Sequence, residues 1–189
     1  MKYRGLLNAC REGLIGCTIR VLHRDRDLRI KAGATDLNHG ELLLKLELRG
    51  NPELLCAVRG AMDGLTARMG FSEPECRSVT RAVDEALANV IRHAYDGKPD
   101  QPIELTCYRT RGAVDGEPRD GLEIVLEDYG APVDPEKLRG RPLDEIRPGG
   151  LGLHYIRESM DDMEFSRSHG ANRLRLVKYL QPRDSKASS

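Results

Sequence analysis

Polar side chains that could do chemistry lie along one edge of a predicted helix in residues 83–97, VDEALANVIRHAYDG. At about 100° per residue, Glu85, Asn89 and Arg92 fall within roughly 60° of one another, with His93 beside them. The amide oxygen of Asn89 is a hard, neutral ligand suited to Mg²⁺, and the Glu85 carboxylate could orient or deprotonate a hydroxyl. Taken alone, the same pattern is typical of a solvated helix face.

A second candidate position is Asp128 in the segment 126–132, LEDYGAP, where an apolar predicted strand ends. A carboxylate there can accept a hydrogen bond from the exocyclic amine of adenine, whereas it would repel the carbonyl oxygen of guanine. Gly130 would let the backbone approach a base closely. The alternative is an ordinary Asp-x-Gly turn.

A third candidate is the glycine cluster of residues 147–160, RPGGLGLHYIRESM, which runs into a predicted helix. The free amides and the positive dipole end of a helix N-terminus attract phosphate. No Lys-Ser or Lys-Thr follows and no strand precedes, which argues against a Walker loop and a dinucleotide fingerprint. A flexible linker is the competing interpretation.

The elements that must position these residues alternate between helix and strand patterns. Ser72 and Glu75 form a predicted capping box, and Gly70 marks the end of the preceding helix. Expected helices cover residues 55–69, 72–95 and 151–160, and expected strands cover 42–48, 103–108, 122–128, 163–168 and 173–180. A long polar loop is expected between the strands at 103–108 and 122–128. This order predicts an α+β two-layer sandwich, with a mixed, largely antiparallel sheet and helices on one face.

Bulk composition restricts the class of protein. The chain has 189 residues, 39% hydrophobic and 32% charged, which suits one globular domain. Its 30 basic and 30 acidic residues balance, which argues against a general nucleic-acid binder. Five cysteines without a CxxC motif indicate buried free thiols. No apolar run has the length of a membrane span, and Arg11 and Glu12 interrupt the N-terminal segment, so we expect a cytoplasmic protein without membrane contact.

Taken in order, the three motifs resemble those of the GHKL (Bergerat-fold) ATP-binding superfamily, which includes histidine kinases and gyrase. Within it, the chain is similar to the single-domain serine-protein kinases that act as bacterial anti-sigma factors. VDEALANVIRHAY resembles the N box, LEDYGAPVDP the first glycine box and RPGGLGLHYIRESMDDMEF the second. The similarity covers about residues 41–180. It implies an N-terminal extension at 1–38, an ATP-binding domain at 39–181 and a tail at 182–189.

The resemblance implies roles for particular residues. Asn89 would ligate Mg²⁺, Glu85 would be the catalytic base, Asp128 would read the adenine amine and Gly130 would lie beneath the base. The loop and helix start around the phosphates would comprise Gly149, Gly150, Leu151, Gly152 and Leu153. Arg92 and His93 would line the phosphate side, with a packing role for His93 as the alternative. One departure is HGAN, where Ala171 and Asn172 replace the small hydroxyl residue with which many members hold adenine through water.

The implied function is that of an ATP- and Mg²⁺-dependent serine/threonine protein kinase acting on a STAS-domain anti-sigma antagonist. A sigma factor would be a second partner, and the protein would be a homodimer without direct nucleic-acid binding. The main alternative is a non-catalytic regulator that binds partners according to its nucleotide state, and a second is an ATPase that releases phosphate to water. The presence of Glu85 favours the kinase, because a pure binder needs no base.

Overall fold

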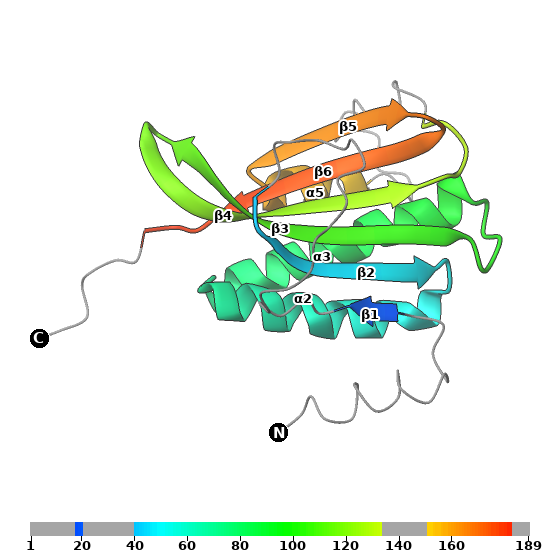
Figure 1. Ribbon diagram of the computed structural model, residues 1–189, viewed down its shortest axis with the longest axis horizontal. Helices are drawn as coiled ribbons and strands as arrows, with labels where there is room; N and C mark the ends of the chain where they lie inside the picture. Colours follow the sequence, from blue (N-terminus) through cyan, green and yellow to red (C-terminus); the bar gives the residue numbers. More distant parts are fainter. Residues whose placement is uncertain (1–17, 21–39, 134–150, 183–189) are drawn as a thin grey trace, which may run out of the picture.

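The computed structural model describes residues 18–20, 40–133 and 151–182, which form one antiparallel sheet with helices packed on it (Figure 1). In this part of the chain the strand order is β1-β2-β3-β4-β6-β5, and every pairing is antiparallel. The strands are β1 (Thr18–Arg20), β2 (Leu42–Arg49), β3 (Pro102–Val114), β4 (Glu117–Asp128), β5 (Asp162–Ser168) and β6 (Ala171–Tyr179). The helices are η1 (Pro52–Leu54), α2 (Leu55–Met69), α3 (Glu73–Asn89), η2 (Val90–Ala94) and α5 (Leu151–Ser159).

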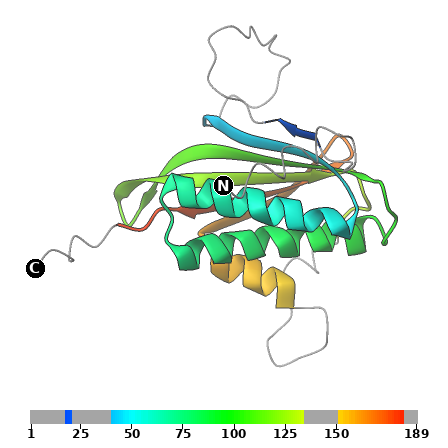
Figure 2. The same cartoon turned by 90° about the horizontal axis from the view of Figure 1, so that it is seen from below.

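The helices α2, α3 and α5 lie on one face of the sheet, as Figure 2 shows. Alternate strand residues such as Leu46, Leu105 and Ile124 point into the interface between the two layers, where each is at most 1% exposed. The helices supply apolar side chains from the other side, including Met62 and Val79. The expected α+β two-layer sandwich with helices on one face is therefore confirmed.

Local sequence signals set the ends of α2 and the beginning of α3. Gly70 has φ 99°, a left-handed conformation that glycine adopts without steric cost, and it ends α2. The predicted capping box is present, because Glu75 Oε2 accepts hydrogen bonds from the backbone N–H and hydroxyl of Ser72. Phe71 and Cys76, which flank the cap, are both buried in the core.

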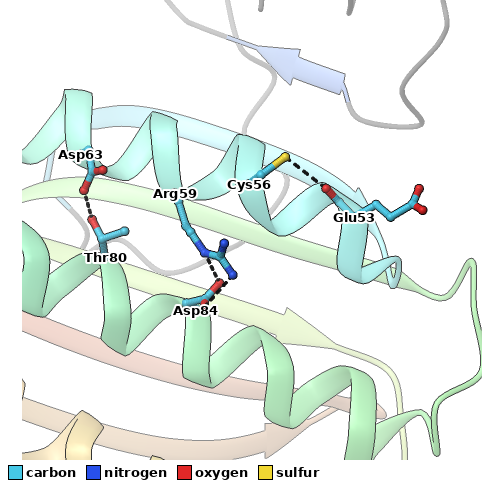
Figure 3. A network of polar contacts seen from close by, with 6 residues as sticks. All are labelled: Glu53, Cys56, Arg59, Asp63, Thr80 and Asp84. Atoms are coloured by element: carbon cyan, nitrogen blue, oxygen red, sulfur yellow. Dashed lines mark hydrogen bonds and ion pairs between the residues drawn. The ribbon is translucent and has the colours of Figure 1, made fainter.

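One ion pair and one hydrogen bond between side chains join α2 to α3 (Figure 3). The Arg59 guanidinium binds both carboxylate oxygens of Asp84, at 2.9 and 3.0 Å. One turn towards the N-terminus of α3, the Thr80 hydroxyl donates to Asp63 Oδ1 at 2.6 Å. Asp84 directly precedes Glu85, so these contacts fix the rotation of α3 about its axis next to the candidate site.

The connection between β3 and β4 differs from the expected long loop. The strands pair continuously as far as Val114 and Glu117, and the turn consists of Asp115 and Gly116 alone. Their φ angles of 54° and 80° are those of a type I′ turn, which matches the twist of a hairpin. The polar segment 111–120 therefore forms the outer end of the β3–β4 hairpin, called here the β3–β4 arm. Strands whose two faces are both solvated can be polar throughout.

The second difference is at the end of the predicted long helix. The last five residues, Val90–Ala94, form a π-helical turn, and the Tyr95 N–H donates to Val90 O at 3.1 Å. Such turns have i→i+5 hydrogen bonds, so the side chains beyond Asn89 are out of phase with an α-helix. The edge from Glu85 to Arg92 is therefore not one continuous α-helical edge.

Two ion pairs of Arg175, one to a buried glutamate, connect the last three strands on the helix-free face of the sheet. Arg175 on β6 binds Glu123 on β4 at 3.0 Å and Asp162 on β5 at 2.7 Å. Glu123 is 4% exposed. Burial alone would lower the pKa of Arg175, but the two carboxylates outweigh burial and raise that pKa. Arg175 thus links β6 to both of its neighbouring strands, β4 and β5.

The described cysteines are free, as predicted, but not all are buried. Cys76 and Cys107 lie in the core, and burial raises the pKa of Cys107 to about 12, whereas Cys56 is exposed on α2. Cys10 and Cys17 lie outside the described residues. None of the described helices combines the length and apolar character that crossing a membrane requires.

The β3–β4 turn makes a stability prediction with a matched control. Gly116→Ala forces a side chain into a left-handed conformation and is expected to lower the free energy of unfolding by about 1 kcal/mol. Gly60→Ala, inside α2 where an added Cβ meets no atom within 4 Å, is expected to raise it by about 0.5–1 kcal/mol. Urea denaturation of both variants measures the difference, and equal effects would contradict the assigned turn.

Candidate nucleotide-binding site

Glu85 and Asn89 meet the first turn of α5. A Cβ added to Gly152 would lie 3.0 Å from Glu85 Oε2 and 3.7 Å from Asn89 Nδ2. Both polar side chains are half-buried. The backbone N–H groups of a first helical turn have no partner within the helix. The fold therefore places a carboxylate and an amide beside the backbone of a first helical turn, with Gly152 where they meet.

Side-chain packing holds α5 against α3. The Arg81 guanidinium lies over the Tyr155 ring, 4.2 Å from its centre, and Ile156 is completely buried. Leu153 is half-buried, and its side chain also packs against the core. Of the phosphate-side role that the resemblance implies for Leu153, this packing leaves chiefly a contact through its backbone.

The second part of the candidate site is the end of β4, where the Asp128 carboxylate is buried and hydrogen-bonded. Its Oδ1 accepts from the backbone N–H of Gly130 at 2.9 Å and from Asn172 Nδ2 at 2.7 Å. Asp128 is 5% exposed. No hydrogen bond from the described residues reaches the other oxygen, Oδ2. Among the described residues, one acceptor of this buried carboxylate therefore has no hydrogen-bond partner.

The loop after Asp128 lies directly on the end of η2. The Ala131 N–H donates to Ala94 O at 2.9 Å, and a Cβ on Gly130 would overlap that same carbonyl. Gly130 is therefore required by close approach of two backbones. Ala94 follows Glu85 by nine residues, about 13 Å along a helix. Both parts of the candidate site thus lie on one continuous helical support.

Tyr95 fixes this end of the site, a role that the sequence analysis missed. Its hydroxyl donates to Pro102 O at 2.5 Å and accepts from the Tyr129 N–H at 2.9 Å. Burial raises the pKa of Tyr95. The only sequence signal was an aromatic residue at the end of a helix, which does not specify that its partners are the start of β3 and the residue after Asp128.

Asn172 was noted in the sequence only as a departure, and the structure gives it a position beside Asp128. The β4–β6 register places it directly opposite Asp128, and it is 1% exposed. The turn at His169 and Gly170, with φ angles of 51° and 85°, sets the register of β5 and β6, in which Arg167 lies opposite Asn172. This local turn could have predicted that Asn172 pairs with Arg167, but not that it contacts Asp128, because the β4–β6 register arises only in the assembled sheet.

The remaining predicted residues are not joined to this cluster. Arg92 and His93 are exposed on η2, and among the described residues no side-chain hydrogen bond or ion pair connects them with Glu85, Asn89 or Gly152. Gly149 and Gly150 lie outside the described residues, as does the side chain of Leu151, which begins α5.

The described residues hold no group of three or more His, Cys, Asp or Glu side chains that could bind a metal ion by themselves. Because Gly152 has no side chain, it leaves room beside Asn89 and Glu85. One amide oxygen beside a carboxylate fits Mg²⁺, which keeps several waters and is typically held by few protein ligands together with phosphate oxygens.

Comparison with known proteins identifies the family. Residues 48–178 match the model of the histidine kinase-like ATPase domain. The chain belongs to this family.

Three relatives are each named serine-protein kinase RsbW. The protein from Oceanobacillus iheyensis is 28% identical, over 67% of this chain and 80% of its own length. The relative from Bacillus pumilus is also 28% identical, over 73% and 86%, and one from a strain of Bacillus cereus is 30% identical, over 73% and 85%. The resemblance to the GHKL superfamily and its serine-protein kinase branch is confirmed.

The Tyr95 contacts predict a stability effect. Tyr95→Phe removes one hydroxyl that serves two hydrogen bonds and leaves the Tyr129 N–H unpaired, so we expect a loss of about 1–2 kcal/mol in the free energy of unfolding. Tyr155→Phe is the control, because its hydroxyl makes no hydrogen bond to a described residue. Chemical denaturation of the two variants compares them, and equal stabilities would show that the Tyr95 hydroxyl is not needed at this position.

Proposed function

We propose that this protein is an ATP- and Mg²⁺-dependent serine/threonine protein kinase of the anti-sigma type. The main support is that Glu85 and Asn89 on α3 lie against the start of α5. The same helix continues into η2, whose end contacts the Asp128 loop. Family membership gives the nucleotide class, and the relatives' name, serine-protein kinase, supports transfer to a hydroxyl.

In the proposed complex, the adenine amine donates to Asp128 Oδ2 and the base lies over Gly130. A carboxylate is an acceptor and not a donor, so adenine fits and guanine, with a carbonyl at that place, does not. The triphosphate then extends along α3 towards Gly152. The spacing of about 13 Å from Ala94 to Glu85 along the helix suits an extended nucleotide.

The phosphates would meet the first turn of α5, where free N–H groups and the helix dipole favour negative charge. We assign this contact to Leu151, Gly152 and the backbone of Leu153, and to Gly149 and Gly150 before them. Arg92 and His93, exposed on η2, would contribute positive charge and donors on the phosphate side.

Asn89 would hold Mg²⁺ through its amide oxygen, together with phosphate oxygens. When bound, the ion neutralises charge that develops on the transferred group. Glu85 would accept the proton of the attacking serine or threonine hydroxyl, one helical turn from Asn89. Since Gly152 lies against both side chains, the hydroxyl and the phosphate would be brought together at this glycine.

The proposed protein substrate is a serine or threonine of a STAS-domain anti-sigma antagonist, with a sigma factor as second partner. We further propose that residues 39–181 form the ATP-binding domain, with an extension at 1–38 and a tail at 182–189, and that the protein is a cytoplasmic homodimer. These assignments rest on the resemblance of the motifs to the anti-sigma kinases.

Replacing the proposed base separates binding from chemistry. Glu85→Gln should reduce phosphate transfer to the partner by about 100-fold or more, with MgATP affinity within about three-fold of wild type, because only the proton acceptor is lost. Glu73→Gln, an exposed glutamate at the start of the same helix, should leave both unchanged. The measurements are phosphoprotein formation on a purified STAS-domain antagonist and calorimetric titration with MgATP.

Three results would contradict this assignment. Undiminished transfer by Glu85→Gln would remove Glu85 as the base. A stable complex between wild-type protein, ATP and partner without any product would support the non-catalytic regulator. Phosphate released to water without modification of the partner would support the ATPase.

The metal role of Asn89 predicts a loss of magnesium dependence. The ratio to measure is the affinity for ATP in the presence of Mg²⁺ divided by the affinity for ATP in the presence of a chelator. Asn89→Ala should reduce this ratio by about ten-fold, since one ligand of the ion is removed. Asn51→Ser, which keeps the cap of η1, should preserve the ratio. An unchanged ratio in Asn89→Ala, measured by calorimetry, would exclude Asn89 as the ligand.

A further inference from the structure

Asp128 is the end of a chain of side-chain contacts that crosses three strands. Asn172 on β6 donates from Nδ2 to Asp128 Oδ1 at 2.7 Å and to Ala131 O at 3.1 Å. Arg167 on β5 donates from Nη1 to Asn172 Oδ1 and to Gly130 O at 3.3 Å. The network therefore connects the carboxylate with the loop on both sides of Gly130.

The sheet register builds this network. Arg167 pairs with Asn172 across β5 and β6, and Asn172 pairs with Asp128 across β6 and β4. Directly opposite residues of antiparallel strands share a face. All three side chains thus stand in one row on the helix-covered face, at the end of the sheet where the Asp128 loop begins.

The amide of Asn172 can take only one orientation in this row. Reversing it would set its oxygen against the Asp128 carboxylate and its amine against the Arg167 guanidinium. In the observed orientation both N–H bonds and the oxygen have partners. Many members of the superfamily have a small hydroxyl residue here that holds adenine through water. Asn172, in contrast, retains no N–H donor for a base.

We propose that Asn172 and Arg167 are positioning residues that make Asp128 select the amino group of adenine. This inference rests on the proposed function, in which Asp128 reads the base. The Gly130 N–H and Asn172 occupy Oδ1 and prevent rotation of the carboxylate, so Oδ2 is the acceptor for the base. Arg167 holds Asn172 and the Gly130 carbonyl at fixed separation.

The physical reason is that an unrestrained carboxyl group discriminates poorly. It can rotate both oxygens away from the base. Donors directed at Oδ1 hold the Asp128 carboxylate in one rotamer, in which Oδ2 is the acceptor left for the base. A buried site that must pair a particular polar group rejects a ligand lacking that group.

The test compares three nucleotides that differ at position 6 of the purine: ATP with an amine, purine riboside triphosphate with hydrogen, and inosine triphosphate with a carbonyl and, in consequence, a hydrogen on N1. Calorimetric titration of each, with Mg²⁺, gives affinity ratios from which the triphosphate and metal contributions cancel. Wild-type protein should prefer ATP over both others.

Asn172→Leu, close in size but without hydrogen bonds, should reduce that preference by about ten-fold. Arg167→Gln should reduce the preference for ATP by about three-fold, because the hydrogen bond from Asn172 to Asp128 survives. Arg167→Lys, which keeps a cationic donor, should retain more of the preference than Arg167→Gln. Arg111→Gln, an exposed arginine paired with Asp120 on the β3–β4 arm, is the control and should leave the ratios unchanged.

The outcomes distinguish this inference from the proposed function. If the wild-type protein binds none of the three nucleotides, the proposed function fails. If it binds all three equally, or if Asn172→Leu and Arg167→Gln weaken all three by the same factor, nucleotide binding stands and the positioning role is overturned. Circular dichroism checks folding, and if Asn172→Leu does not fold, the two Arg167 variants decide the question.

Discussion

The site depends on burial of one side of α3. Val79, Val83 and Leu87 are each at most 2% exposed against the sheet, and a fully buried aliphatic side chain contributes about 1.5–3 kcal/mol. Because these residues fix which side of the helix faces inward, Glu85 and Asn89 are left at the lateral edge, where α5 packs. The ion pair between Arg59 and Asp84 holds the same rotation from the outward side.

The interactions within single segments were predictable from the sequence. Gly70, the capping box at Ser72 and the alternation of Leu44, Leu46 and Leu48 each report on a few neighbouring residues, and the structure has the expected element at each. The long polar stretch after Tyr108 was wrongly expected to be a loop. Polarity excludes burial but not strand structure, and the Asp-Gly pair at 115–116 was the stronger signal.

Interactions between distant segments were harder to predict. Tyr95 contacts Pro102 and Tyr129, and Asn172 contacts Asp128, 44 residues away. These contacts require a register that only the assembled sheet defines. The π-helical turn is a further example, since nothing in the residues 90–94 distinguishes it from the α-helix before it, and it separates Arg92 and His93 from the row that Glu85 and Asn89 begin.

The two ends of the candidate site differ in how they are anchored. At the Asp128 end, one phenolic oxygen connects the end of η2 with the backbones of β3 and β4, and the Ala131 N–H adds a second backbone tie. At the other end, α5 has a backbone tie to the sheet after its last turn, where the Asp161 N–H donates to Val177 O. In the described part of the chain its first turn is held by side chains alone. The fold thus secures one end of the candidate site through backbone hydrogen bonds and the other through the packing of side chains between two helices.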